Sequence, residues 1–376
     1  MNDWQPVTFT VETPMFLRGA DQQAAEFRLP SLRGALRFWF RAMAGLAFDG
    51  DEARIDQEEA DLFGSAAGAK GPAPSSLRFR PGPVRKAPPN AAWAGPDGIR
   101  YLIGPSITDL PAHLAPGRAG SFSVRGRSAD DLQRVGVCLA ALSRYGGLGA
   151  RVRRGFGAIR FGGLNALCPG IEAIMAAETA PMGLFDTFCG LYDVPPRSPS
   201  ATAISPKPSF SAWQRKVSAH QPWTTWSAAL DEVGKAFDRY RSPIDRNAED
   251  AQQFNQYDPR RYMSREYRHI IDPEKYGNRR EQNPVFPLGA FGLPIQFAHG
   301  RTVTLWEGAR ELRRASPLWI RPVRAGDRQW QVIYHVFRSD LWPDSAGLKL
   351  SPGGHRLRLD SETAYSKLAD WLEKAP

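Results

Sequence analysis

Several segments of the chain place hydrophobic residues at the spacing of a strand or a helix. In residues 7–12 (VTFTVE), β-branched and aromatic residues alternate with polar ones, which is typical of a half-buried strand. Residues 31–45 (SLRGALRFWFRAMAG) carry apolar side chains at helical spacing, and Ser31 is a suitable N-cap. The same spacing over 128–145 predicts a second helix, which Gly146 and Gly147 end.

The other predicted elements follow from the same two patterns. Strands are predicted at 77–80, 121–126, 156–161, 290–297, 302–307, 316–323 and 331–337, and helices at 223–240 and 362–374. The first half therefore reads strand, helix, strands, helix, strand. This order favours an α+β fold with helices packed on one face of a sheet.

A proline-rich segment divides the chain into two predicted domains. Residues 194–210 hold five prolines and few core candidates, so they are interpreted as a linker between residues 1–193 and 211–376. Each domain carries a predicted insertion. Residues 64–98 are rich in Gly, Pro and Ala, and residues 242–284 are polar with nearly balanced charge.

Composition indicates a folded protein of the cytoplasm. The 376 residues are 42% hydrophobic and 23% charged, and no apolar run approaches the ~20 residues that cross a bilayer. Asp3, Glu12 and Arg18 stand where a signal peptide would be apolar. The three cysteines share no close spacing, and the six histidines form no metal-binding pair. We therefore expect no disulfide framework, no metal and no cofactor.

Positive charge is concentrated in two segments. The net charge is +10, and residues 118–160 hold nine arginines against two aspartates, while residues 301–338 hold eight arginines against three acids. A GC-rich genome also favours arginine, but a uniform codon bias would not concentrate it in this way. Because the guanidinium fork grips phosphate, nucleic acid is the leading class of partner.

The segment 146–157 (GGLGARVRRGFG), called here the glycine-rich loop, is the first candidate binding motif. Its glycines let a ligand approach the backbone N–H groups, and its arginines supply counter-charge for phosphates. It matches neither a Walker loop nor a dinucleotide fingerprint; a hairpin with solvated arginines is the alternative. The candidate residues are Gly146, Gly147, Gly149, Arg151, Arg153, Arg154, Gly155, Phe156 and Gly157.

The predicted helix after Pro30 supplies the second candidate motif. Arg33, Arg37 and Arg41 recur every four residues and therefore share one face, where they repel one another unless an anion neutralises them. A solvated face is the alternative. Gly34 inside this helix costs up to ~1 kcal/mol relative to alanine, which a close approach of chain or ligand would explain. Trp39 suits either a stacked base or the core.

Two stretches together resemble the RAMP superfamily of CRISPR-associated proteins. They are VTFTVETPMFLRGADQQAAEFRLPSLRGALRFWFRAM (7–43) and GGLGARVRRGFGAI (146–159), and within the superfamily the pattern is similar to the first Cmr subunit of type III-B effector modules. AFGLPIQF (290–297) and RRASPLWIRPV (313–323) extend the resemblance into the second half. The resemblance implies two ferredoxin-like (RRM-like) domains with insertions.

The resemblance also implies a place in an RNA-guided complex that acts in antiviral defence. The family's glycine-rich loop corresponds to 146–157 and its basic helix motif to 31–41, including Ser31. Arg18, Arg313 and Arg314, within the matching stretches, complete the expected RNA-binding set. The expected partners are guide RNA near its 3′ end, target RNA and other RAMP subunits. We expect the two arginine clusters to converge on one strand in a groove between the domains.

No catalytic residue is carried over from the resemblance, so the chain is predicted to be non-enzymatic. Two alternatives remain open. One is a metal-independent RAMP endoribonuclease that processes CRISPR transcripts, with a histidine such as His113 as general base. The other is a pure assembly subunit whose arginines face acidic neighbours.

Overall fold

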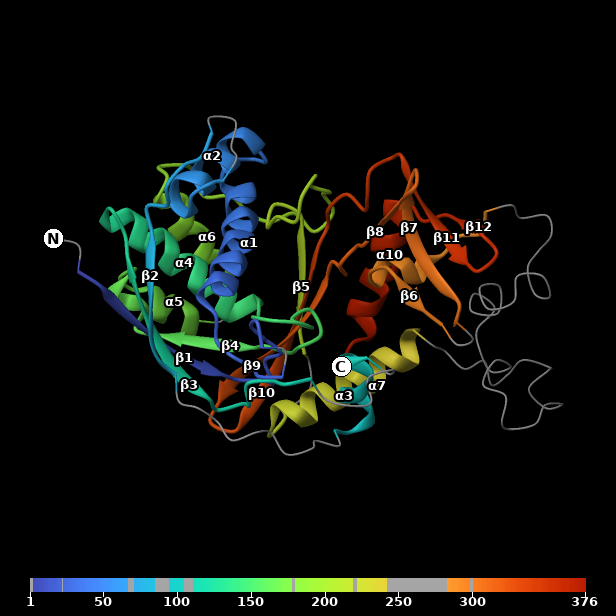
Figure 1. Cartoon of the computed structure of the whole chain (residues 1–376), viewed down its shortest axis with the longest axis horizontal. Helices are drawn as coiled ribbons and strands as arrows, with labels where there is room; N and C mark the ends of the chain where they lie inside the picture. Colours follow the sequence, from blue (N-terminus) through green and yellow to red (C-terminus); the bar gives the residue numbers. More distant parts are fainter. Residues whose placement is uncertain are drawn as a thin grey trace. The chain divides into compact units, whose positions relative to one another are not determined.

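The protein is an α+β chain, as the sequence predicts, and its sheets are antiparallel (Figure 1). The computed structural model describes residues 3–21, 23–66, 71–84, 95–104, 111–177, 180–218, 222–241, 283–297 and 300–376. The chain forms two compact units. Unit 1 comprises residues 1–96, 102–230 and 319–339, and unit 2 comprises residues 97–101, 231–318 and 340–376.

Unit 1 contains a four-stranded antiparallel sheet in the order β2-β3-β1-β4. The chain order of its main elements is β-α-β-β-α-β, the order of a ferredoxin-like domain. The first elements are β1 (Gln5–Val11), α1 (Leu29–Ala47), α2 (Glu52–Phe63), β2 (Arg78–Val84), β3 (Ala119–Arg125), α4 (Ala129–Tyr145) and β4 (Ile159–Gly162). They are followed by η1 (Leu164–Ala166), α5 (Ile171–Ala176) and α6 (Ala180–Gly190).

Alternation in the strands decides which face of this sheet is buried. In β1, Val7, Phe9 and Val11 are buried, whereas the intervening residues lie on the opposite face. Helices α1, α4, α5 and α6 lie together on the buried side (Figure 1). Helix α4 begins with a capping box in which Ser128 and Asp131 satisfy each other's backbone N–H groups, which confirms the predicted start.

Unit 1 also includes strands from later in the chain. A three-stranded sheet has the order β5-β10-β9, formed by β5 (Trp213–Val217), β10 (Gln329–Phe337) and β9 (Leu318–Gly326). The proline-rich segment 194–210 does not divide the units, because it packs on unit 1. The side chain of Phe210 is fully buried, and its N–H donates to the carbonyl of Ala42 over 2.9 Å.

Unit 2 has a five-stranded sheet and a C-terminal helix. Its elements are η4 (Pro287–Phe291), β6 (Ile295–Gln296), β7 (Thr302–Glu307), β8 (Arg310–Leu312), β11 (Ala346–Ser351), β12 (His355–Leu357) and α10 (Ser361–Lys374). Helices α3 (Asp97–Ile103) and α7 (Trp226–Arg241) have residues in both units. The sheet order is β12-β11-β7-β6, with β8 paired to β7.

Two predictions differ from this structure, and a third falls mostly on residues that it does not describe. Of the strand predicted at 290–297, only Ile295–Gln296 form a strand (β6), because residues 290–291 end η4 and Gly292 adopts φ +106°, which breaks the extended run. The predicted insertion 64–98 contains β2, a full strand of the main sheet paired with β3. Residues 242–282, most of the second predicted insertion, lie outside the described residues.

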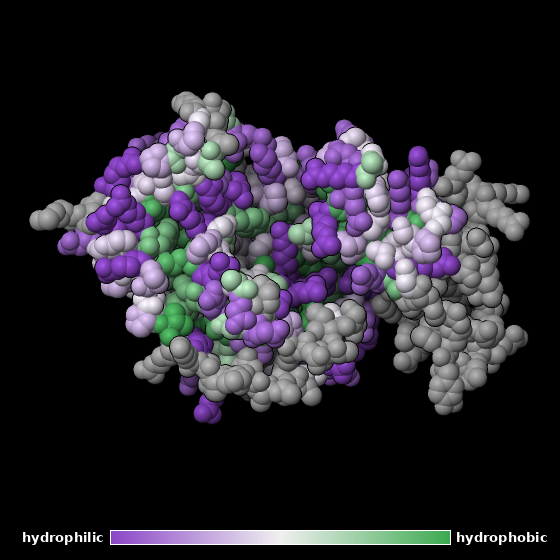
Figure 2. Space-filling model, viewed as in Figure 1, coloured by the Kyte–Doolittle hydropathy of each residue, from purple (hydrophilic) through white to green (hydrophobic). Residues whose placement is uncertain are grey.

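The visible surface is mainly hydrophilic (Figure 2). Among the described residues, only Met182 and Ile204 are large hydrophobic side chains classed as exposed. No helix in the described ranges combines the length and hydropathy that a membrane span needs.

Candidate nucleic-acid interface

A cavity of about 490 Å³ in unit 1 brings together residues from both N-terminal motifs. Ser31, Ala35, Phe38 and Trp39 contribute one face of α1, and the glycine-rich loop contributes the opposite wall. The complete lining is Phe16, Leu17, Arg18, Ser31, Ala35, Phe38, Trp39, Gly147, Leu148, Gly149, Ala150, Val152 and Trp319. Four predicted site residues therefore share it: Arg18, Ser31, Gly147 and Gly149.

The glycine-rich loop is held in place by the segment that follows β1. The hydroxyl of Thr13 donates to the carbonyl of Gly155 over 2.8 Å and accepts from the N–H of Ala158 over 2.9 Å. The N–H of Ala150 donates to the carbonyl of Phe16 over 2.8 Å. These bonds hold the segment after β1 against the glycine-rich loop, although about 140 residues separate them in the chain.

Close packing of these segments requires glycine at position 149. Gly149 adopts φ +100°, and a Cβ there would lie 2.6 Å from the carbonyl oxygen of Phe16. Both the left-handed backbone and the space exclude a larger residue. The glycine therefore shapes the cavity wall, as well as leaving the backbone accessible on the cavity side.

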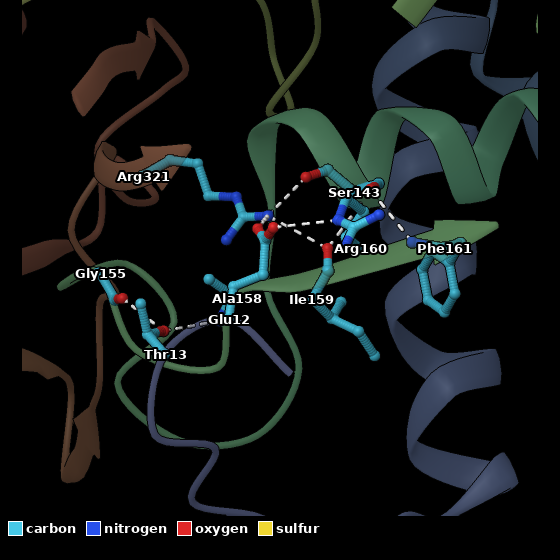
Figure 3. Close-up of polar contacts among 9 residues, drawn as sticks. All are labelled: Glu12, Thr13, Ser143, Gly155, Ala158, Ile159, Arg160, Phe161 and Arg321. Atoms are coloured by element: carbon cyan, nitrogen blue, oxygen red, sulfur yellow. Dashed lines mark hydrogen bonds and ion pairs between the residues drawn. The ribbon is translucent and has the colours of Figure 1, made fainter. Parts of the chain in front are cut away.

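A buried ion pair joins β9 to the main sheet and α4 (Figure 3). The guanidinium of Arg321 lies 3.5 Å from the carboxylate of Glu12 and donates to the carbonyls of Ser143 (2.5 Å) and Ile159 (3.1 Å). Arg160 approaches Glu12 from another side, at 3.3 Å. Burial lowers the pKa of Arg321 to about 10, and the charge of Glu12 opposes that change. The guanidinium is therefore charged at neutral pH.

This anchor sets the position of Trp319, two residues before Arg321, in the cavity wall. The Trp319 ring stacks on His335, with centroids 5.7 Å apart and planes 12° apart. The guanidinium carbon of Arg153 lies 4.9 Å from the same ring's centroid. Trp319 is only 5% exposed, and its indole N–H has no hydrogen-bond partner. A buried donor without an acceptor carries a free-energy cost.

The arginine row of α1 faces α2 and not the cavity. Arg33 donates to the carbonyl of Phe63, and Arg37 and Arg41 lie 2.7 and 2.8 Å from the buried carboxylate of Glu59. Arg37 also donates to the carbonyl of Gly64. The prediction that this row converges on the glycine-rich loop is wrong. Helix α2, which the sequence analysis did not predict, supplies the counter-charge for the row.

The remaining predicted residues are distributed over both units. On the loop, Arg151 is exposed, Arg153 and Arg154 are half-buried, and Gly146, Gly155, Phe156 and Gly157 are buried. Arg313 and Arg314 belong to unit 2. Arg314 donates to the carbonyl of Leu341 over 2.9 Å, and burial lowers its pKa, so its guanidinium serves the packing of unit 2. The cavity itself is formed by unit 1 alone.

Sequence analysis missed Trp319, Phe38 and Thr13 as site residues. Trp319 comes from β9, late in the chain, and nothing local indicates that this strand packs beside α1. Phe38 lies one residue before Trp39, and the helical spacing gave it no role. Thr13 belongs to the family-like stretch TPMF, which was the available signal.

Replacing Gly34 by alanine is expected to raise the free energy of unfolding by about 0.5–1 kcal/mol. Gly34 is an exposed residue inside α1, and no atom lies within 4 Å of the place where a Cβ would be. Urea unfolding of both proteins measures the change. Gly149→Ala serves as the opposite control and is expected to destabilise. A destabilising Gly34→Ala would show that another part of the chain approaches this position.

Comparison with known proteins supports the resemblance read from the sequence. The RAMP superfamily model matches residues 8–160. The chain is 43% identical over 53 residues to the CRISPR system Cmr subunit Cmr1-2 of Pyrococcus furiosus, an alignment that covers 14% of this chain and 28% of the relative. It is 48% identical over 40 residues to Cmr1-1 of the same organism, covering 11% and 12%. The alignments thus span under a third of either relative.

The fold likeness extends over the whole chain. The crystal structure of Cmr1 from Pyrococcus furiosus, in its apo form, superimposes with a TM-score of 0.58 at 17% identity and covers 100% of this chain and 97% of that one. At this identity the match shows a common fold. Together these findings confirm the predicted resemblance to the RAMP superfamily and its first Cmr subunit.

Proposed function

We propose that this RAMP-like chain is a non-catalytic RNA-binding subunit of a type III-B (Cmr) CRISPR effector complex. It contacts guide and target RNA near the guide 3′ end, beside other RAMP subunits. The observation that carries the proposal is the unit 1 cavity, where the glycine-rich loop, Arg18 and Ser31 meet four aromatic side chains. The similarity to the Cmr subunits of Pyrococcus furiosus supports the type of complex.

The cavity has the groups that a single RNA strand needs. Arg18 is exposed at the lining, and Arg153 lies on the loop, so both can neutralise phosphates. Phe38 is half-buried and provides a ring surface for an unstacked base in the cavity wall. The protein reads backbone and shape in this proposal, and base pairing between guide and target reads sequence.

The ferredoxin-like assignment is part of the same proposal. The β2-β3-β1-β4 order and the β-α-β-β-α-β chain order support one such domain in unit 1. We infer a second from the likeness to Cmr1, built from the later strands. In this proposal the arginine row of α1 (Arg33, Arg37 and Arg41) holds α2 on the first domain. Arg18 and the arginines of the glycine-rich loop make the RNA contacts.

The double variant Arg153→Ala with Arg154→Ala is expected to weaken binding of single-stranded RNA without unfolding the chain. Removing one phosphate contact lowers the slope of log K against log salt by ~0.7, so removing two lowers this slope by ~1.4. Fluorescence anisotropy with a labelled 20-nucleotide oligouridine at several salt concentrations measures both the affinity and the slope. Arg310→Ala with Arg356→Ala, exposed arginines on β8 and β12, is the charge-matched control.

Two outcomes would replace this proposal by the open alternatives. If both double variants bind equally well, and ultraviolet light crosslinks no RNA to the loop, the chain is an assembly subunit. If purified protein cleaves repeat RNA in EDTA and His113→Ala abolishes cleavage, it is an endoribonuclease. His113 lies in unit 1, with Nδ1 3.1 Å from the carbonyl of Pro111 and its ring 5.5 Å from that of Phe16.

A further inference from the structure

The face of the β2-β3-β1-β4 sheet that points away from α1 and α4 carries a second concentration of arginine. The four strands of this sheet contain four arginines and neither aspartate nor glutamate. Strand register places all four on the face opposite the core: Arg78, Arg80, Arg125 and Arg160. Arg78, Arg80 and Arg160 are exposed, and Arg125 is half-buried.

Two of these arginines flank an indole ring. The guanidinium carbons of Arg80 and Arg125 lie 4.9 and 5.2 Å from the ring centroid of Trp4, which is half-buried just before β1. Cation–π contacts hold all three planar groups together. The result is a platform of planar groups at the Trp4 end of the sheet face, where further planar groups can stack.

The arginines of this platform repel one another. Arg78 and Arg125 are direct cross-strand partners, and like charges in that position destabilise a sheet. Among the described residues, Asp3, next to Trp4 in the chain, is exposed and forms no ion pair with these arginines. Glu12, just after β1, is buried and engaged with Arg160 and Arg321, so it offers the platform no compensation. An anionic ligand on this face would relieve the repulsion.

Hydroxyl groups lie on the same face beside the arginines. Thr8 pairs with Ser121, and Ser123 pairs with Arg80, so donors and acceptors line the strands between the charged residues. Hydroxyls of this kind can bind ribose 2′-OH groups and phosphates. An acidic protein would pair only with the positive charge of this face. An RNA strand can also stack on its planar groups and hydrogen-bond to its hydroxyls.

We propose that this face, defined by Trp4, Arg78, Arg80 and Arg125, is a second binding surface for single-stranded RNA, separate from the cavity. Phosphates pair with the arginines, and one or two bases stack on the Trp4 platform. RRM domains bind single strands on the open face of a four-stranded sheet through stacked aromatic side chains. The surface stands on its own residues and does not require the cavity to bind RNA.

The test uses the full chain and a labelled 20-nucleotide oligouridine. The variant Arg78→Gln with Arg80→Gln is expected to lower the salt slope by ~1.4, and Trp4→Leu to weaken binding at least about tenfold. Trp4→Phe, which keeps a stacking ring, is expected to restore most of the affinity. The control is again Arg310→Ala with Arg356→Ala, and circular dichroism verifies folding.

The same variants are also made in the Arg153→Ala with Arg154→Ala background. If the sheet variants reduce RNA affinity by the same factor in both backgrounds, the two surfaces bind RNA independently. If the loop variant alone leaves the affinity unchanged while the sheet variants still reduce it, the sheet surface binds RNA and the cavity does not. Unchanged affinity and salt slope in the sheet variants would overturn the inference. The inference would also be overturned if the sheet variants lost binding to polyglutamate but still bound RNA normally, because an acidic protein would then be the occupant of this face.

Discussion

Replacing Glu12 by glutamine is expected to lower the free energy of unfolding by about 3–5 kcal/mol. The glutamine keeps the size of the side chain but removes its charge, which leaves the guanidinium of Arg321 buried without a counter-ion. Arg321 is 2% exposed, and its Nε and one terminal nitrogen already have no hydrogen-bond partner. Urea unfolding followed by tryptophan fluorescence measures the change.

Two further variants separate this effect from a general loss of packing. Arg160 is the other partner of Glu12, but its side chain is 57% exposed, so Arg160→Gln is expected to cost at most about 1 kcal/mol. The double variant Glu12→Gln with Arg321→Met removes both buried charges and is expected to recover most of the stability. Equal, small effects of Glu12→Gln and Arg160→Gln would contradict the role given to the buried pair.

The Glu12–Arg321 pair also connects stability with the proposed site. It fixes β9, and β9 carries Trp319 into the cavity wall. Ile320 lies between Trp319 and Arg321 on β9. Its N–H donates to the carbonyl of Arg153 over 3.2 Å, which joins β9 to the glycine-rich loop. Glu12 and Arg321 are therefore positioning residues.

The second large effect is a loss of stability in acid that depends on His335. Its Nδ1 accepts a hydrogen bond from the indole N–H of Trp213 over 3.1 Å, so Nε2 carries the proton and donates to the carbonyl of Tyr145 over 2.9 Å. Burial, helped by the charges of nearby arginines, lowers the pKa of this histidine to about 3. The folded protein thus holds a neutral imidazole at every pH above about 3.

The direction of the pH effect follows from proton linkage. Unfolded His335 titrates near 6.5, so between about pH 6.5 and 3 the unfolded chain binds a proton that the folded chain does not. The stabilisation that comes from the neutral His335 is therefore fully present above about pH 6.5 and decreases as the pH falls from 6.5 toward 3. At pH 5, protonation of His335 in the unfolded chain lowers the free energy of unfolding by about 2 kcal/mol relative to pH 7.5.

Comparison with His335→Gln isolates this contribution from those of the carboxylates. Unfolding free energies of both proteins are measured from pH 7.5 to pH 5. The variant is less stable at neutral pH because its packing against Trp319 is altered, but its stability is expected to fall about 2 kcal/mol less over this interval. Parallel curves for the two proteins would show that the histidine does not remain neutral in the fold.

Local patterns in the sequence predicted the α+β class and most of the elements around the main sheet. The helix over 128–145 and the strand over 302–307 are confirmed, because a capping box and a run of β-branched residues are local signals that agree with the tertiary packing. The glycine-rich loop was also found by sequence, since positive φ and close packing at Gly149 restrict the residue type.

What sequence alone determined, then, is which residues form most of the elements around the main sheet and which motifs are candidates for binding an anion. Tertiary structure decided which motifs share a surface. Arg37 and Arg41 of α1 bind Glu59 because α2 packs beside them, whereas Ser31 and Phe38 on another face of the helix line the cavity. Trp319 enters the same cavity from about 280 residues away through a buried ion pair. Local periodicity carries no information about such distant partners, because they are selected by burial and charge pairing in the complete fold.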